Sequence, residues 1–237
     1  MAKMTLLEMV QSTMSALDSD EVENIDDTPE SEQIVDLIVD LYRELTENEN
    51  IPELHKLFLL TLDTGNTVFT IPTDISKLFW IKYDKRKTAG ANTDYLPVYF
   101  LDPSDFIERT NGRNSTDSTV ESLAEPGGSG ISILIKNNKA PEWWTTFDDE
   151  HIVMDSYDSG IDASGLVASK TQCFGQEVPT VTRVNSTVLD LDGNLFPFLL
   201  AEVKSTAFST LKQEINQKID KQARQAKAKY QNDRHRF

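Results

Sequence analysis

Residues 28–45 read TPESEQIVDLIVDLYREL, and this stretch predicts an amphipathic helix around which the rest of the chain can be organised. Thr28 is a favourable N-cap, and Pro29 suits the first helical position because its missing N–H costs no hydrogen bond there. The acids of the first turn favour the positive end of the helix dipole. The apolar side chains recur on one helix face: Ile34, Leu37, Ile38, Leu41 and Leu45. The helix should end near residues 48–50, before Ile51-Pro52.

Helical patterns also occupy both ends of the chain. Met4–Leu17 carries apolar residues at helical spacing and precedes an acidic connector, residues 18–27. From Leu195 onward an apolar residue returns at every fourth position: Leu199, Val203, Ala207, Leu211, Ile215 and Ile219. Beyond Ile219 this stripe stops. We therefore expect Lys221–Phe237 not to pack on the chain's own body, and to be disordered or held by a partner.

The middle of the chain, from about Leu54 to Val178, has a different pattern of short β-like runs broken by turn residues. The predicted strands are Leu57–Leu62, Thr67–Ile71, Leu78–Tyr83, Leu96–Leu101, Ile131–Ile135, Trp143–Phe147, His151–Asp155 and Leu166–Gln172. Asp63–Asn66 and Lys136–Asn137–Asn138–Lys139 are typical of hairpin turns. A short helix should begin at Asp102-Pro103, and Arg109–Gly130 should be a long exposed loop.

The predicted fold class is α+β, with terminal helices forming a small helical bundle, an inserted β-rich domain and a C-terminal arm. The expected boundaries divide the chain into four parts. These are residues 1–53 for the N-terminal helices, 54–190 for the β-rich insert, 191–220 for a long C-terminal helix and 221–237 for a basic arm.

Composition excludes several classes of protein. The net charge of -16 argues against broad nucleic-acid binding, which needs a surplus of lysine and arginine. The N-terminus lacks the apolar run of a signal peptide, and no stretch approaches the roughly 20 apolar residues of a membrane span. Cys173 is the only cysteine, so no intrachain disulfide can form. We expect a soluble protein from a reducing compartment.

The charge is distributed unevenly along the chain. Residues 1–60 hold 15 acids against 3 bases, whereas residues 212–237 hold 8 bases against 3 acids. Opposite charges at the two ends are suited to contact between copies of the chain. The alternative interpretation is that both ends are simply solvated helices.

Three places carry residue types that could support chemistry. Asp190–Asn194 resembles a fragment of a calcium loop, but the ligands that such a loop needs further on are missing, so the pattern favours a turn in which Asp192 or Asn194 caps the final helix. Asp148, Asp149, Glu150, His151 and Asp155 could hold a divalent ion for hydrolysis. Their position between two predicted strands favours a polar hairpin turn instead.

Cys173 could in principle act as a nucleophile with His55, His151 or His235. No neighbouring residue suggests activation of the thiol, so a cysteine that is either buried or simply unreactive is the favoured interpretation. No phosphate-binding loop, nucleophile elbow or zinc-protease motif occurs in the sequence. We predict a protein that is not an enzyme and has no cofactor.

Three stretches resemble the tail adaptor proteins of short-tailed bacteriophages, also described as head-to-tail connector or tail tubular protein A-like proteins. The middle stretch is the most specific of the three. The matching stretches are MTLLEMVQ (4–11) with LDSDEV (17–22) and the helix after Thr28, KAPEWWTTFDDE (139–150) through IVMDSYD (152–158), and FPFLLAEVKSTAF (196–208). Residues 111–130 match nothing in that family's pattern.

The resemblance implies a virion protein of the tail or neck, assembled in the host cytoplasm. The resemblance also implies that twelve copies form a ring beneath the portal protein, as in members of such families. The ring extends the DNA channel and provides a platform for a tail nozzle or other tail proteins, tail fibres included. Genomic DNA would pass through without sequence-specific binding, and no membrane is involved. The family has no catalytic residues or metal ligands to transfer.

The basic C-terminal segment is the candidate contact with the portal or with a neighbouring subunit. The residues expected to make this contact are Lys221, Arg224, Lys227, Tyr230, Arg234, Arg236 and Phe237. Two other functions remain open at this point: another virion component, such as a tail-tube or head-completion subunit, and a metal-dependent hydrolase built on the acids around His151.

Overall fold

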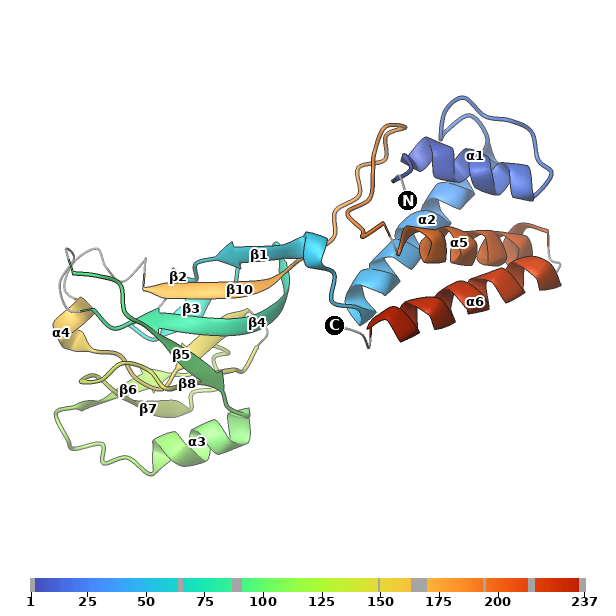
Figure 1. The fold of residues 1–237 in the computed structure, drawn as a ribbon. Helices are drawn as coiled ribbons and strands as arrows, with labels where there is room; N and C mark the ends of the chain where they lie inside the picture. Colours follow the sequence, from blue (N-terminus) through green and yellow to red (C-terminus); the bar gives the residue numbers. More distant parts are fainter. Residues whose placement is uncertain are drawn as a thin grey trace. The chain divides into compact units, whose positions relative to one another are not determined.

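Two units with separate cores make up the fold. The computed structural model describes residues 3–63, 66–86, 91–148, 150–162, 170–193, 195–212 and 216–234. The first unit comprises Met1–Leu54 and Pro179–Phe237, and the second comprises His55–Val178. We call them the helical unit and the β unit. Helices together with a curled mixed sheet confirm the predicted α+β class (Figure 1).

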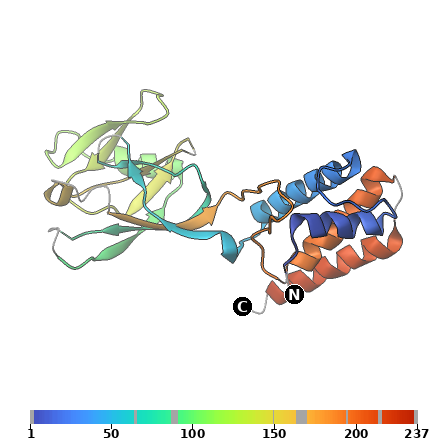
Figure 2. The same ribbon diagram turned by 90° about the horizontal axis from the view of Figure 1, so that it is seen from above.

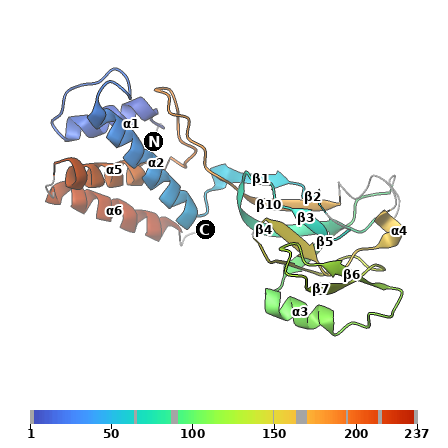
Figure 3. The same ribbon diagram turned by 180° about the vertical axis from the view of Figure 1, so that it is seen from behind.

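In the described residues, four helices build the helical unit: α1 (Leu6–Ala16), α2 (Pro29–Asn48), α5 (Phe196–Leu211) and α6 (Gln217–Arg234). α1 and α2 pack against each other and against α5 (Figure 2). α6 lies along α5 (Figure 3). The shared core is formed by the apolar faces of these helices, with Leu6, Met9, Ile38 and Val203 fully buried.

The starts of the first two helices follow local sequence rules. The Thr5 hydroxyl accepts a hydrogen bond from the Glu8 N–H (3.3 Å), and the Glu8 carboxylate accepts one from the Thr5 N–H (2.7 Å). Thr28 and Ser31 form the equivalent reciprocal pair at the start of α2, both at 3.1 Å. The predicted cap at Thr28 is therefore confirmed, and α2 ends at Asn48, as its pattern predicted.

The β unit contains an eight-stranded sheet in the order β1-β10-β4-β5-β8-β9-β3-β2, in which only β5 and β8 pair in parallel. The strands are β1 (His55–Phe58), β2 (Thr61–Leu62), β3 (Val68–Thr70), β4 (Ile75–Asp84), β5 (Tyr95–Phe100), β8 (Trp143–Thr146), β9 (His151–Met154) and β10 (Thr171–Glu177). The β unit also contains the short helix α4 (Ser159–Asp162), whereas the short helix η1 (Pro52–Leu54) belongs to the helical unit.

The two ends of this sheet order must come together in space. β1 and β2 are its outermost strands, yet only Leu59 and Leu60 separate them along the chain. The sheet therefore curls until its ends meet and encloses an apolar core. Residues of this inner core are Leu60, Phe69, Ile81, Tyr83, Val98, Ile152, Met154 and Cys173.

Part of the outer face of the curled sheet is covered by further elements. α3 (Pro103–Asn111) and a separate hairpin of β6 (Val120–Ala124) and β7 (Ser132–Lys136) pack over the side formed by β3, β8 and β9. Phe106 from α3 and Ile133 from β7 are fully buried in this outer core. The Asp102 side chain caps α3 by accepting a hydrogen bond from the Ser104 N–H (2.9 Å), as the sequence predicted.

Three predictions for the β unit were wrong in part. Residues 109–130 are not one exposed loop, because α3 extends to Asn111 and β6 pairs with β7 along its length. Leu57–Leu62 is not one strand, because the chain passes from one end of the sheet to the other at Leu59–Leu60. The predicted turn at residues 136–139 does not close a hairpin of its own, because β7 pairs with β6. Of the predicted strand 166–172, residues 166–169 lie outside the described residues.

The C-terminal boundaries also differ from the prediction. Residues 179–190 belong to the helical unit rather than to the insert, because Leu189 is buried in the helical core and Val181 packs against it. The predicted single helix up to residue 220 is two helices, α5 and α6. Asp192 does not cap α5 through its side chain: the N-cap is Leu195, which has no side-chain cap. Asn194 lies outside the described residues.

Candidate functional site

Five of the predicted contact residues, Lys221, Arg224, Lys227, Tyr230 and Arg234, lie on α6, and this placement corrects one expectation. Lys221 and Arg224 are exposed, whereas Ala223 on the packed side of the helix is only 3% exposed. Lys227, one turn after Ala223, is also exposed and lines a pocket beside α2 and α5. The segment after Ile219 therefore packs on its own chain, against α5. The stripe of large apolar residues does stop after Ile219. Alanine, however, lets two helices approach closely, and the alanines of this segment were the signal that sequence reasoning missed.

The remaining candidate residues have a less complete description. Tyr230 and Arg234 fall within the last turns of α6, whose backbone is described. Arg236 and Phe237 lie outside the described residues. Arg224 is held along the helix by Asp220, with Nη2 2.8 Å and Nε 3.3 Å from the two carboxylate oxygens. Because Arg224 is 79% exposed, this ion pair adds little stability and leaves the cation on the surface.

α2 presents a surface of the opposite charge. Its apolar side, including Ile34 and Ile38, is buried in the helical core. The exposed side repeats acids at a spacing of about one helical turn, which places them in a row. This acidic face consists of Glu32, Asp36, Asp40, Glu44 and Glu47. Arg183 forms an ion pair with Asp36, with 2.6 Å between Nη2 and Oδ1.

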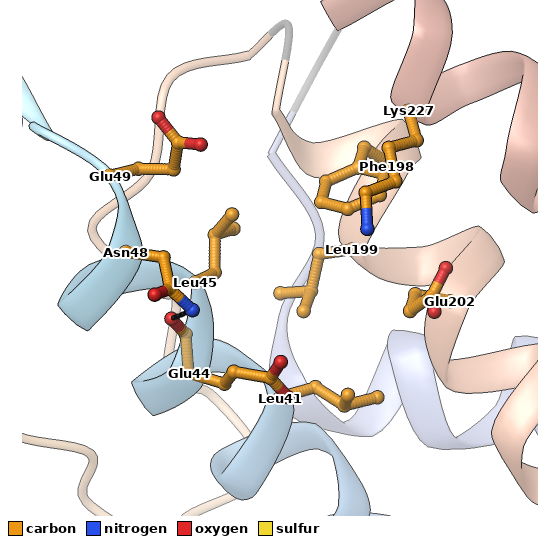
Figure 4. Close-up of a pocket in the computed structure, with 9 residues that line it drawn as sticks. All are labelled: Leu41, Glu44, Leu45, Asn48, Glu49, Phe198, Leu199, Glu202 and Lys227. Atoms are coloured by element: carbon orange, nitrogen blue, oxygen red, sulfur yellow. Dashed lines mark hydrogen bonds between the residues drawn. The ribbon is translucent and has the colours of Figure 1, made fainter. Parts of the chain in front are cut away.

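A small pocket lies where the C-terminal end of α2 meets α5 and α6 (Figure 4). Leu41 and Leu199 form apolar walls, and the carboxylates of Glu44 and Glu202 lie beside them. Its volume is about 120 Å³, well below the roughly 300 Å³ at which small-molecule sites begin. The remaining lining residues are Leu45, Asn48, Glu49, Phe198 and Lys227. The pocket is thus a joint between helices rather than a cofactor site.

Two of the acids proposed as metal ligands, Asp148 and Asp155, are engaged by other groups. Asp148 accepts hydrogen bonds from the His151 N–H (2.8 Å) and lies 2.6 Å from His151 Nδ1. Burial of Asp148 opposes its ionisation, but the hydrogen bonds from His151 outweigh it and lower the Asp148 pKa. The hydrogen bond to Asp148 raises the His151 pKa. His151 Nε2 also lies 3.8 Å from Asp63 Oδ2 and connects the β8–β9 turn to Asp63, just after β2.

Asp155 serves a separate purpose. Its side chain is fully buried, and Oδ1 accepts hydrogen bonds from the N–H groups of Glu142 (3.0 Å) and Trp143 (3.1 Å). Oδ2 accepts one from Arg113 Nη2 at 2.8 Å. Within the described residues, no group of three or more metal-ligating side chains comes together. Asp149 lies outside the described residues. The hydrogen bonds that Asp155 accepts suit a structural anchor.

Cys173 is fully buried in the inner core, which is one of the two outcomes that the sequence favoured. Burial raises the pKa of the thiol to about 12, so the thiolate is scarce near neutral pH. The ring of His55 packs on Phe174, with 5.0 Å between ring centroids. Phe174 follows Cys173 on the strand and points to the opposite face, so no Cys173–His55 pair forms. His235 lies outside the described residues.

No protein-family model matches this chain, and no curated protein matches it significantly. No helix in the described part of the chain is both long and apolar enough to cross a membrane. The features available for assigning a function are therefore the two oppositely charged helix faces and the sequence resemblance itself.

Proposed function

We propose that this chain is a structural virion protein, a ring-forming head-to-tail adaptor that docks under the portal, extends the DNA channel and provides the attachment platform for tail proteins. The resemblance of three stretches to tail adaptor proteins supports this function. The finer architecture is part of the proposal: the terminal helices act as a small bundle, the β unit is inserted in it, and the basic end of α6 serves as the contact arm.

One observation carries the proposal. The helical unit exposes an acidic face on α2 and a basic face on α6, the latter including Lys218, Lys221 and Arg224. Closed rings form through heterologous contacts, in which two different faces of each subunit meet. Complementary charge on the two faces would steer that contact and set its register. The subunit number, dodecameric in the resembling family, follows from the resemblance alone.

The net charge of -16 suits a DNA channel as well. Acidic walls repel phosphates, so a duplex could slide through without being gripped. The same acids repel one another when copies assemble, although salt screens them beyond a Debye length of about 10 Å at 0.1 M. We therefore expect the free protein to be mostly monomeric and the portal to act as the template for ring closure.

The alternatives have less support. A tail-tube or head-completion subunit would also need complementary faces, and only the resemblance favours the adaptor over it. A hydrolase at His151 would need Asp155 as a ligand, but both oxygens of that carboxylate already accept hydrogen bonds from the chain.

The proposal is tested by charge reversal with compensation. The variant K218E/K221E/R224E should stay folded but lose binding to the portal protein and ring formation on it, as measured by sedimentation and negative-stain microscopy. Adding E32K/D36K/D40K should restore contacts between copies, because both faces are then reversed. If the first variant assembles on the portal like the wild type, or if the wild type forms a stable ring alone at micromolar concentration, the templated charge contact is wrong.

A further inference from the structure

The outer face of the curled sheet at β1, β10 and β4 carries a cluster of apolar side chains. Leu57 lies opposite Phe174, and Phe174 lies opposite Trp80, so these three side chains form one row on the same face. Their strand neighbours Cys173 and Ile81 point into the inner core instead. We call the set His55, Leu57, Phe79, Trp80 and Phe174 the aromatic platform.

A β-bulge adds Phe79 to this platform. Phe174 pairs with Trp80 while Gly175 pairs with Leu78, so Phe79 is the extra residue on β4. Its ring contacts those of His55 (5.4 Å between centroids) and Phe174 (5.6 Å). Phe174 in turn stacks on Trp80 at 5.7 Å. Because each ring is held by its neighbours, the surface is organised before any partner arrives, which lowers the entropy lost on binding.

The rest of the β unit leaves this platform uncovered. α3 and the β6–β7 hairpin pack over β3, β8 and β9, on the other part of the outer face. Leu57 remains 60% exposed and Phe79 39% exposed. A contiguous apolar patch of this kind on a folded protein marks an interaction site more often than chance, whereas single exposed apolar residues do not.

The charges beside the platform indicate which charge a binding partner should carry. Register places Lys77 and Lys82 on the same face, opposite Gln176 and Gln172 respectively. Lys82 Nζ lies over the Trp80 ring, 4.6 Å from its centroid. Asp84 follows Lys82 on the same face of β4, but its side chain is fully buried and paired with Arg86, whose Nε lies 2.7 Å from Asp84 Oδ2. The face therefore complements carboxylates, while two lysines provide too few phosphate contacts for nucleic-acid binding.

We infer that the aromatic platform with Lys77 and Lys82 is a docking surface for an acidic segment of a partner protein. Apolar side chains of that segment would cover Leu57 and Phe79, and its carboxylates would lie near the two lysines. This contact is independent of the proposed ring, because it uses the β unit and the ring contact uses α2 and α6.

Fluorescence anisotropy with two synthetic peptides tests the inference. One peptide alternates leucine and phenylalanine with glutamate, and the other carries lysine in place of each glutamate. The full-length chain should bind the glutamate peptide and prefer it over the lysine peptide. Its overall negative charge would draw the lysine peptide non-specifically, so this preference is diagnostic of a local basic site.

Variants locate the binding to the platform. L57S and K82E should each weaken glutamate-peptide binding about tenfold or more, equivalent to about 1.4 kcal/mol. I131S changes a residue of similar exposure (54%) outside the platform and should leave binding unchanged. The inference would be overturned if all three variants lost glutamate-peptide binding equally. A preference for the lysine peptide, or displacement of the glutamate peptide by single-stranded DNA, would also contradict it. Assembly of L57S on the portal should be normal, which separates this result from the proposed function.

Discussion

The anchor between Arg113 and Asp155 makes the sharpest prediction about the β unit. Arg113 lies just beyond α3, in the stretch predicted to be an exposed loop, yet its side chain is only 9% exposed. Nη1 donates to the carbonyl oxygens of Leu134 (2.8 Å) and Asp155 (2.5 Å), and Nη2 donates to the Asp155 carboxylate (2.8 Å). One side chain thus ties the end of α3 to β7 and to the residue that follows β9.

The variant R113A should destabilise the β unit by about 3–5 kcal/mol, because it leaves the fully buried Asp155 carboxylate without its counter-charge. This is a large share of a typical unfolding free energy of about 5–15 kcal/mol. With a urea m-value of about 2 kcal/mol/M, the midpoint should fall by about 2 M. R113K should be destabilised as well, because lysine lacks the planar fork that serves several acceptors at once.

The assay can be confined to the β unit, because the protein's tryptophans, Trp80, Trp143 and Trp144, all lie within it. Urea unfolding followed by tryptophan fluorescence therefore reports on that unit. The matched control is R109A, one helical turn earlier: Arg109 is 48% exposed and lies 3.7 Å from Glu142. The control should cost about 1 kcal/mol or less. If R113A costs no more than R109A, the buried ion pair is not the anchor inferred from the structure.

Three further predictions concern other parts of the chain. Hydrogen bonding to Asp148 raises the His151 pKa above its ordinary 6.5, so the stability that this contributes is complete below pH 6.5 and is lost as pH rises through the pKa of His151 in the folded protein. The Asp148 pKa is lowered, so its contribution is present above pH 3.8 and is lost as pH falls through the pKa of Asp148 in the folded protein. Imidazole NMR titration should give a lower His151 pKa in D148N, and an unchanged value would contradict the contact. Cys173 should react with a thiol reagent in native buffer only at the rate of unfolding, since its thiol is buried and its pKa is about 12; fast labelling that is independent of urea would contradict this. Removing the α2 cap with T28A should cost the helical unit about 1 kcal/mol by circular dichroism at 222 nm, whereas the exposed Q33A should have little effect.

The sequence by itself determined the features that depend on neighbouring residues. The start of α2 at Thr28 and the cap of α3 at Asp102 were predictable, because a capping side chain bonds to a backbone N–H only two or three residues away. Most strands of the β unit were predictable for a similar reason, since alternation of polar and apolar side chains is a local pattern.

Only the tertiary structure decided the features that depend on distant residues. Alternation does not specify a partner, so the split of Leu57–Leu62 between the two ends of the sheet could not be predicted. β6 was missed because its burial depends on pairing with β7 and on contact with the outer core. Arg113 and Asp155 are 42 residues apart, and α6 buries Ala223, a residue too small to mark an apolar stripe. In each case the stabilising contact joins residues that are distant in the sequence. A local sequence pattern contains only one of the two partners, so it cannot predict the contact.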